Sequence, residues 1–166
     1  MPIHHTASYP AEPARVLAML TDEGFLRDYA AALGAQVEEL SVEPGDRPRT
    51  SLRLRVPVFG VPRPFRRFVG GQIPLADRRT WRSGDEGGYE AEVEVRIEVG
   101  GRAAVVCARQ TLRAAAEGTA AEVTGEAFVD VPLIGRQAEA AVREGAMVVL
   151  RRETEVLRRR LGGPPG

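Results

Sequence analysis

The chain has 166 residues, enough to bury one sizeable hydrophobic core without a metal or disulfide staple. Its 23 basic and 23 acidic side chains cancel, which argues against nucleic acid as a partner, because general polyanion binders carry an excess of positive charge. The absence of lysine excludes Schiff-base catalysis, and the single Cys107 excludes an intramolecular disulfide or a multi-cysteine zinc site.

The start of the chain predicts one strand followed by two short helices. The strand covers residues 3–9, and the helices cover 11–20 and 22–33. Thr21 is a favourable N-cap for the second helix, because its hydroxyl oxygen can accept a hydrogen bond from a free N–H group of the first turn. Gly34 is expected to end that helix, since glycine readily adopts the left-handed conformation of a C-terminal cap.

The middle of the chain predicts an antiparallel meander of six strands. Its clearest member is 89–99, in which apolar residues such as Val93 and Val95 alternate with charged ones. Alternation with a period of two indicates a sheet with one apolar face and one face in water. The six strands are expected at residues 35–43, 51–56, 72–82, 89–99, 102–114 and 121–129.

The chain closes with its longest predicted helix, which starts after Pro132 and runs to about Leu161. Only this helix is long enough to cross the apolar face of the whole meander. We therefore predict an α+β helix-grip fold, in which a curved antiparallel sheet of about seven strands (β-α-α-β6-α) surrounds the C-terminal helix. Residues 1–161 are expected to form one domain, followed by a flexible tail at 162–166.

Several stretches of sequence resemble one known family. They are the opening from His5 to Val16, Met19 to Leu26, Val69-Gly70-Gly71 followed by Trp81, and Val131-Pro132-Leu133-Ile134-Gly135 before the last helix. These stretches are similar to a bacterial domain-of-unknown-function family, number 2505, in the START-like (SRPBCC) superfamily. That superfamily includes birch-pollen-allergen-like proteins, lipid-transfer domains and polyketide cyclases. The resemblance implies the fold and a cavity for a lipid, steroid or polyketide, but no particular reaction.

The space between the sheet and the last helix is the first candidate site. Many of the side chains expected there are small, so that either an apolar cavity or a fully packed core is compatible with the sequence. The residues expected to line such a cavity are Leu54, Val56, Trp81, Val93, Val95, Ile97, Val106, Gln110, Val142, Gly145 and Val149.

Polar side chains on the strand 72–82 form a second candidate. With a regular period of two, Asp77 and Arg79 share the face of Trp81 and point inward, where buried charges must be paired or meet a ligand. Alternatively, a bulge near Pro74 reverses the register and places both charges in water. We favour the bulge, because bulges are common near the rims of sheets.

The two histidines of the first strand, His4 and His5, must point to opposite faces, so that at most one looks inward. An inward His5 would supply an acid or base near neutral pH, but we favour exposed histidines without a special role. Arginines are interleaved with phenylalanines in the segment 57–68. This pattern is compatible with a docking site, but we favour an ordinary solvated connection.

No metal ion or cofactor is expected, because the sequence lacks the motifs of the common hydrolases, nucleotide enzymes and zinc proteases. No apolar run reaches the length of a membrane span and no signal-peptide pattern opens the chain, so we expect a cytoplasmic protein without integral membrane association. The sequence does not indicate an oligomeric state.

These observations favour a non-catalytic binder or carrier of an apolar small molecule. One rival is a polyketide cyclase-like enzyme that uses inward Arg79, Asp77, His5 or Gln110 to orient a polyketone and polarise its carbonyl groups. Another is a regulatory module that docks a partner through the arginine-phenylalanine segment.

Overall fold

The computed structural model of the protein describes residues 2–57, 71–99, 101–130 and 135–162. Seven antiparallel strands form one sheet in the order β1-β7-β6-β5-β4-β3-β2, which confirms the predicted meander from β2 to β7. The first strand pairs with the last strand of the chain and so lies at one edge of the sheet. The strands are β1 (Pro2–Tyr9), β2 (Gln36–Glu43), β3 (Arg49–Pro57), β4 (Gln72–Ser83), β5 (Tyr89–Val99), β6 (Arg102–Ala115) and β7 (Gly118–Val129).

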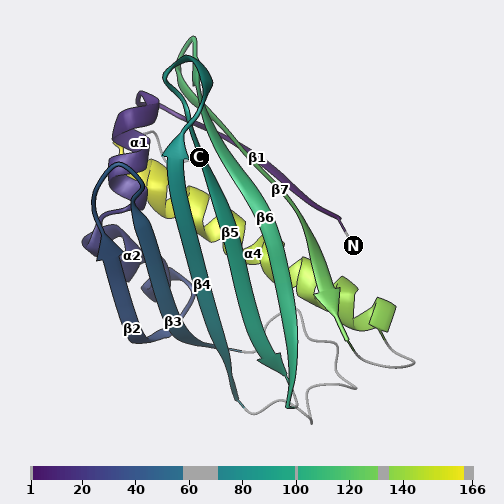
Figure 1. Ribbon diagram of the computed structural model, residues 1–166. Coiled ribbons are helices and arrows are strands. Elements are labelled where there is room, and N and C mark those ends of the chain that lie inside the picture. Colours follow the sequence, from purple (N-terminus) through teal and green to yellow (C-terminus); the bar gives the residue numbers. More distant parts are fainter. Residues whose placement is uncertain (1, 58–70, 100, 131–134, 163–166) are drawn as a thin grey trace.

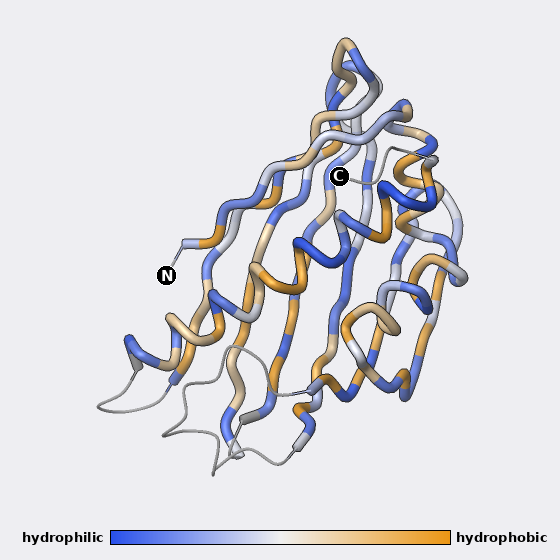
Figure 2. Tube along the Cα trace, turned by 180° about the vertical axis from the view of Figure 1, so that it is seen from behind, coloured by the Kyte–Doolittle hydropathy of each residue, from blue (hydrophilic) through white to orange (hydrophobic). Residues whose placement is uncertain are grey.

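The α-helices lie on one face of this sheet. They are α1 (Pro13–Leu20), α2 (Glu23–Ala32) and α4 (Gly135–Arg160), and a short 3₁₀ turn, η1 (Asp85–Gly87), joins β4 to β5. In Figure 1 the helix α4 runs obliquely behind the strands, and Figure 2 shows it in front when the molecule is turned round. With 26 residues, α4 is about 39 Å long, long enough to cross several strands. The predicted helix-grip fold is confirmed.

The cap of α2 differs from the prediction by one residue. The carboxylate of Asp22, and not the hydroxyl of Thr21, accepts a hydrogen bond from the backbone N–H of Phe25, at 2.9 Å. Thr21 instead donates to the carbonyl oxygen of Leu17, at 2.9 Å, and so belongs to the end of α1. Threonine and aspartate are both good N-caps, and the turn between the helices decides which one is in position.

One end of the molecule holds a densely packed core. There the two short helices cover the sheet, and Phe25 and Tyr29 of α2 stack with ring centroids 6.2 Å apart. Trp81 of β4 is completely buried in the same cluster, together with Leu54 of β3. The large side chains described under α1 and α2 therefore form a closely packed cluster.

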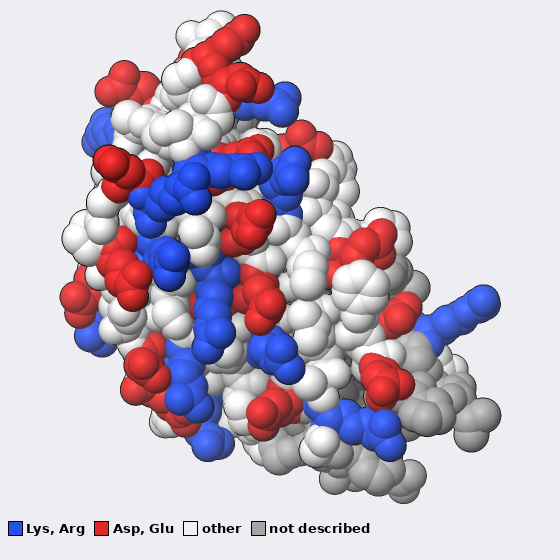
Figure 3. Space-filling view, viewed as in Figure 1, with Lys and Arg blue, Asp and Glu red and all other residues white. Residues whose placement is uncertain are grey.

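The opposite face of the sheet is not covered by helices and carries both signs of charge. Figure 3 shows arginine and acidic side chains interspersed over it. In pairs such as Arg53 with Glu39 both side chains are exposed to water, so each pair contributes little to stability. In the described ranges of the chain, none of the helices combines the length and the apolar character needed to cross a membrane.

Strand β4 keeps a regular register through Pro74. This residue pairs with Arg55 of β3, and the ladder with β5 begins one residue later, at Leu75. Pro74 therefore lies outside the β4–β5 ladder, where its missing N–H group need not interrupt a hydrogen bond. The bulge that we favoured near Pro74 is absent, and a shift in register is found instead in β2, between Val37 and Glu39.

Two glycines with the same φ angle provide a test of this packing. Gly118 and Gly45 both have φ +137°, but a Cβ atom on Gly118 would lie 2.2 Å from the carbonyl oxygen of Tyr9, whereas one on Gly45 would meet no atom within 4 Å. We expect Gly118→Ala to lower the free energy of unfolding by about 1–3 kcal/mol more than Gly45→Ala, because only Gly118 is crowded. Urea unfolding of both variants measures the difference, and equal losses would contradict the described contact of β7 with the end of β1.

Candidate functional site

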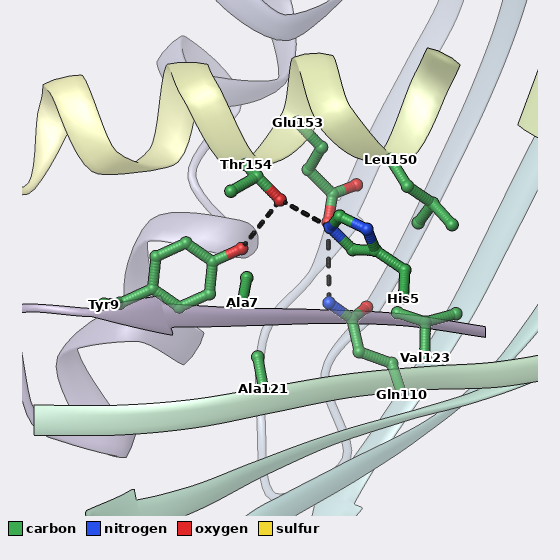
Figure 4. Close-up of a pocket in the computed structure, with 9 residues that line it drawn as sticks. All are labelled: His5, Ala7, Tyr9, Gln110, Ala121, Val123, Leu150, Glu153 and Thr154. Atoms are coloured by element: carbon green, nitrogen blue, oxygen red, sulfur yellow. Dashed lines mark hydrogen bonds between the residues drawn. The ribbon is translucent and has the colours of Figure 1, made fainter. Parts of the chain in front are cut away.

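A small pocket lies between α4 and the strands β1, β6 and β7. Its volume is about 10 Å³, room for one water-sized group. Figure 4 shows the polar side chains pointing into it from the strands and from the helix above them. The polar lining residues are His5, Tyr9, Gln110, Glu153 and Thr154, and the apolar ones are Ala7, Ala121, Val123 and Leu150.

Next to the pocket, Arg79 is held in a buried cluster of ionic and polar groups. Its guanidinium binds Asp77 through Nε and Nη2 at 3.1 and 3.0 Å, and binds Glu153 through Nη1 and Nη2 at 3.1 and 2.6 Å. Nη1 also donates to the amide oxygen of Gln110 at 3.0 Å. These five bonds match the five N–H groups that an arginine possesses, so no donor is left over.

The cluster is well shielded from water. Asp77, Gln110 and Glu153 are only 4%, 2% and 3% exposed, and the side chain of Arg79 is 10% exposed. Burial by itself lowers the pKa of Arg79, but the adjacent carboxylates of Asp77 and Glu153 outweigh this effect and hold the pKa well above its usual value. With both carboxylates ionised, two negative charges face one positive charge, and the cluster carries one excess negative charge.

A chain of hydrogen bonds lies on the other side of the pocket. Thr154 Oγ1 is 3.0 Å from Nε2 of His5 and 3.3 Å from the hydroxyl of Tyr9. Burial lowers the pKa of His5, and this effect outweighs the opposing attraction of Glu153. Burial and then the charge of Glu153 raise the pKa of Tyr9 to about 12, so its hydroxyl keeps its proton at neutral pH.

The structure brings together three of the polar residues expected from the sequence. Asp77, Arg79 and Gln110 all point inward, and the favoured interpretation of exposed charges on β4 is wrong because the strand continues without a bulge. Of the two histidines, His4 is exposed and binds Glu122 on the outer face. His5 is half-buried in the pocket lining, so the expectation of an exposed side chain is wrong for this residue.

The expected apolar lining divides into two groups. Leu54, Val56, Trp81 and Val106 are fully buried. By contrast, the other expected lining residues, which lie on β5 and on the first two thirds of α4, are only half-buried: Val93, Val95, Ile97, Val142, Gly145 and Val149. The buried indole Nε1 of Trp81 has no hydrogen-bond partner in the described part of the chain.

Two important pocket residues, Glu153 and Thr154, were not identified from the sequence. Glu153 interrupts the apolar stripe of α4, four residues after Val149 and four before Leu157. A charged residue at such a position faces the core and needs a partner there, so this interruption was a usable signal. Thr154 had no comparable signal, because threonine is common on both faces of helices. Among the described residues, no group of three or more histidine, cysteine, aspartate or glutamate side chains is arranged to hold a metal ion.

The seven-stranded antiparallel sheet and the long C-terminal helix that crosses it define the protein as an α+β domain of the helix-grip class. The chain belongs to the family described as protein of unknown function (DUF2505), whose model matches residues 4–161. No curated protein matches the sequence.

Solved structures with low sequence identity share this fold. Zhui aromatase/cyclase from Streptomyces sp. R1128 is 13% identical with a TM-score of 0.62, over 98% of this chain and 93% of that one. An uncharacterised protein from Rhizobium leguminosarum is 14% identical with a TM-score of 0.63, over 96% and 95% of the two chains. The protein TTHA0849 from Thermus thermophilus is 17% identical with a TM-score of 0.56, over 95% and 97%.

Removing Arg79, the cation that both carboxylates share, should show how much stability is lost when two buried carboxylates have no partner. We expect Arg79→Met to lower the free energy of unfolding by about 3–5 kcal/mol, because it leaves Asp77 and Glu153 without their partner. Arg53→Met is the matched control, since Arg53 pairs with Glu39 at the surface, and should cost less than about 1 kcal/mol. Denaturant unfolding measures both values, and a loss for Arg79→Met no larger than the control would contradict a buried, fully paired arginine.

The lowered pKa of His5 makes a prediction about pH. The folded protein favours the neutral imidazole, so this contribution to stability is complete above the unfolded pKa of 6.5 and is lost as the pH falls toward the lower, folded value. The free energy of unfolding of the wild type should therefore fall relative to that of His5→Gln between about pH 7 and pH 5. Denaturant unfolding across this range, with His4→Gln as the control, tests this; the same pH-dependent difference in the control would contradict its assignment to His5.

Proposed function

We propose that the protein binds and carries an apolar small molecule, such as a lipid, a steroid or a polyketide-like compound, between the sheet and α4. The apolar body of the ligand would lie against the half-buried side chains of β5 and the first half of α4. One end would reach the polar pocket at His5 and Glu153. The proposed role is carriage without chemical change.

The incomplete burial of inward apolar side chains is the observation that carries this proposal. Val93, Val95 and Ile97 of β5 face the helix side of the sheet, yet they are only half-buried, while Leu54 and Trp81 in the neighbouring core are fully buried. Apolar surface that points inward without being covered is available to an apolar guest, whose binding removes it from water.

The apolar region and the polar pocket are adjacent. Leu150 of α4 lines the pocket and also packs, with Val142, Ala146 and Met147, against the buried cluster of Ile3, Val106 and Ala127. A ligand with an apolar body and one polar end can therefore contact both regions without a break. The similarity in fold to an aromatase/cyclase is compatible with such a ligand, but at 13% identity it supports the architecture alone.

Filling the apolar region should block binding. We expect the uncharged dye Nile red to bind the wild type with a rise in fluorescence, and Ala146→Phe to weaken this binding by at least about tenfold, because the larger ring occupies the space beside Val142. Ala120→Phe is the control, since Ala120 is exposed on β7. Fluorescence titration measures both, and organic extraction followed by mass spectrometry identifies any ligand that co-purifies. No binding by the wild type, together with an empty extract, would overturn the proposal.

A polyketide cyclase-like enzyme is the second candidate, because Gln110 binds Arg79, the partner of Asp77, and also lines the pocket with His5, so that several polar groups of the kind such an enzyme requires are neighbours. The occupied state of Arg79 counts against it, since a guanidinium with no free N–H group cannot polarise a carbonyl unless the cluster opens. His5 remains the available acid or base. The segment proposed for partner docking, 57–68, lies outside the described residues after Pro57.

A further inference from the structure

We infer that the ligand end held in the polar pocket is an uncharged hydroxyl group, and that the site discriminates against carboxylates. This inference rests on the proposed function and names the chemical class of its ligand: an apolar molecule with a terminal or ring hydroxyl. It follows from the donors and acceptors that the pocket leaves free, from its size and from its charge.

Among the described residues, those that line the pocket include no arginine to pair with an anionic end group. The buried cation beside the pocket, Arg79, donates all five of its N–H groups to Asp77, Glu153 and Gln110. With these carboxylates ionised, the cluster has one excess negative charge, which repels a second anion in a poorly hydrated site. Binding a carboxylate there would require the cluster to break or a proton to be taken up.

Two arginines of α4, the exposed Arg151 and the half-buried Arg158, do not reverse this conclusion. Arg151 and Arg158 are near enough to His5 to lower its pKa, although burial is the main cause. Arg151 donates to the carbonyl oxygen of Met147 and Arg158 to that of Ser8, and both of these bonds lie at the surface. Water and salt screen surface charges far more than buried ones, so the buried cluster dominates the field in the pocket.

The groups left free match a hydroxyl. Glu153 accepts three hydrogen bonds, two from Arg79 and one from Gln110 at 3.4 Å, and a carboxylate has about four acceptor positions. The amide nitrogen of Gln110 has a second N–H group without an acceptor among the described residues. A hydroxyl can donate to Glu153 and accept from Gln110, whereas an ammonium group can only donate.

The size of the pocket gives the same answer. A volume of about 10 Å³ accommodates one water-sized group, which a hydroxyl resembles. A carboxylate brings two oxygen atoms and their hydration into the same space. The pocket therefore favours a single oxygen atom that carries one proton.

The test compares amphiphiles of similar size, each below its micelle concentration at neutral pH. The probes are 1-decanol, its isomer 1-methoxynonane, which lacks the O–H donor, and the ions decanoate and decylammonium. Isothermal titration calorimetry, or displacement of Nile red, gives the four affinities. We expect 1-decanol to bind about tenfold more tightly than 1-methoxynonane, because only the alcohol can donate a hydrogen bond to the charged acceptor. We also expect it to bind at least about tenfold more tightly than decanoate, which lacks this donor and is repelled by the excess negative charge.

Glu153→Gln should reduce the preference for 1-decanol over decanoate to about threefold or less, because it removes the excess negative charge. Glu155→Gln, an exposed position on the same helix, is the matched control and should keep the wild-type preference. If Glu153→Gln does not fold, the wild-type series still decides.

Each result of the wild-type series has a distinct meaning. Equal or tighter binding of decanoate, decylammonium or 1-methoxynonane than of 1-decanol overturns the hydroxyl assignment and leaves the proposed function intact. If none of the four probes binds and Nile red also fails to bind, the proposed function fails, and this inference fails with it.

Discussion

The bond network of Arg79 joins the middle of the sheet to the C-terminal helix, and the arrangement of the candidate site depends on it. The guanidinium lies between Asp77 of its own strand and Glu153 of α4, and it also binds Gln110 of β6. Removing any one of these buried partners leaves a charge or a dipole unpaired. The network therefore fixes how α4 lies over the strands at this point, and with it the position of the pocket.

This constraint divides the interior into two regions of different character. Toward the two short helices, large side chains such as Trp81 and Phe25 are fully buried in one packed cluster. Toward the start of α4, the inward valines of β5 and the facing residues of the helix are only half-buried. A sheet and one straight helix cannot stay in close contact along their whole length, because the sheet curves and twists away from the helix. The ion cluster lies at the boundary, with apolar surface on one side and packed core on the other.

The paired state of the arginine also limits the chemistry of the site. Buried arginines in a cavity are natural anion binders, but here both carboxylates come from the protein itself. What remains toward the pocket is a set of hydrogen-bonding groups, including the Tyr9 hydroxyl, which keeps its proton, and a largely neutral His5. Such a lining suits the recognition of a neutral polar group better than the stabilisation of a developing negative charge.

The sequence alone determined the element order, the meander and the length of the last helix. It also determined the period-two alternation that turns Val93 and Val95 inward. These features depend on local periodicity and turn chemistry, which a sequence shows directly. For β4 the sequence was compatible with a regular strand and with a bulge near Pro74, and it favoured the bulge, which is wrong. A proline weakens the strand pattern, but the sequence does not show toward which neighbouring strand its missing N–H group lies. Only the tertiary structure decided that Asp77 and Arg79 are buried and that Glu153, 74 residues beyond Arg79, completes their cluster. The physical reason is that the partner of a buried charge is chosen by the packing of α4 across the sheet, a contact between distant parts of the chain that no local pattern encodes.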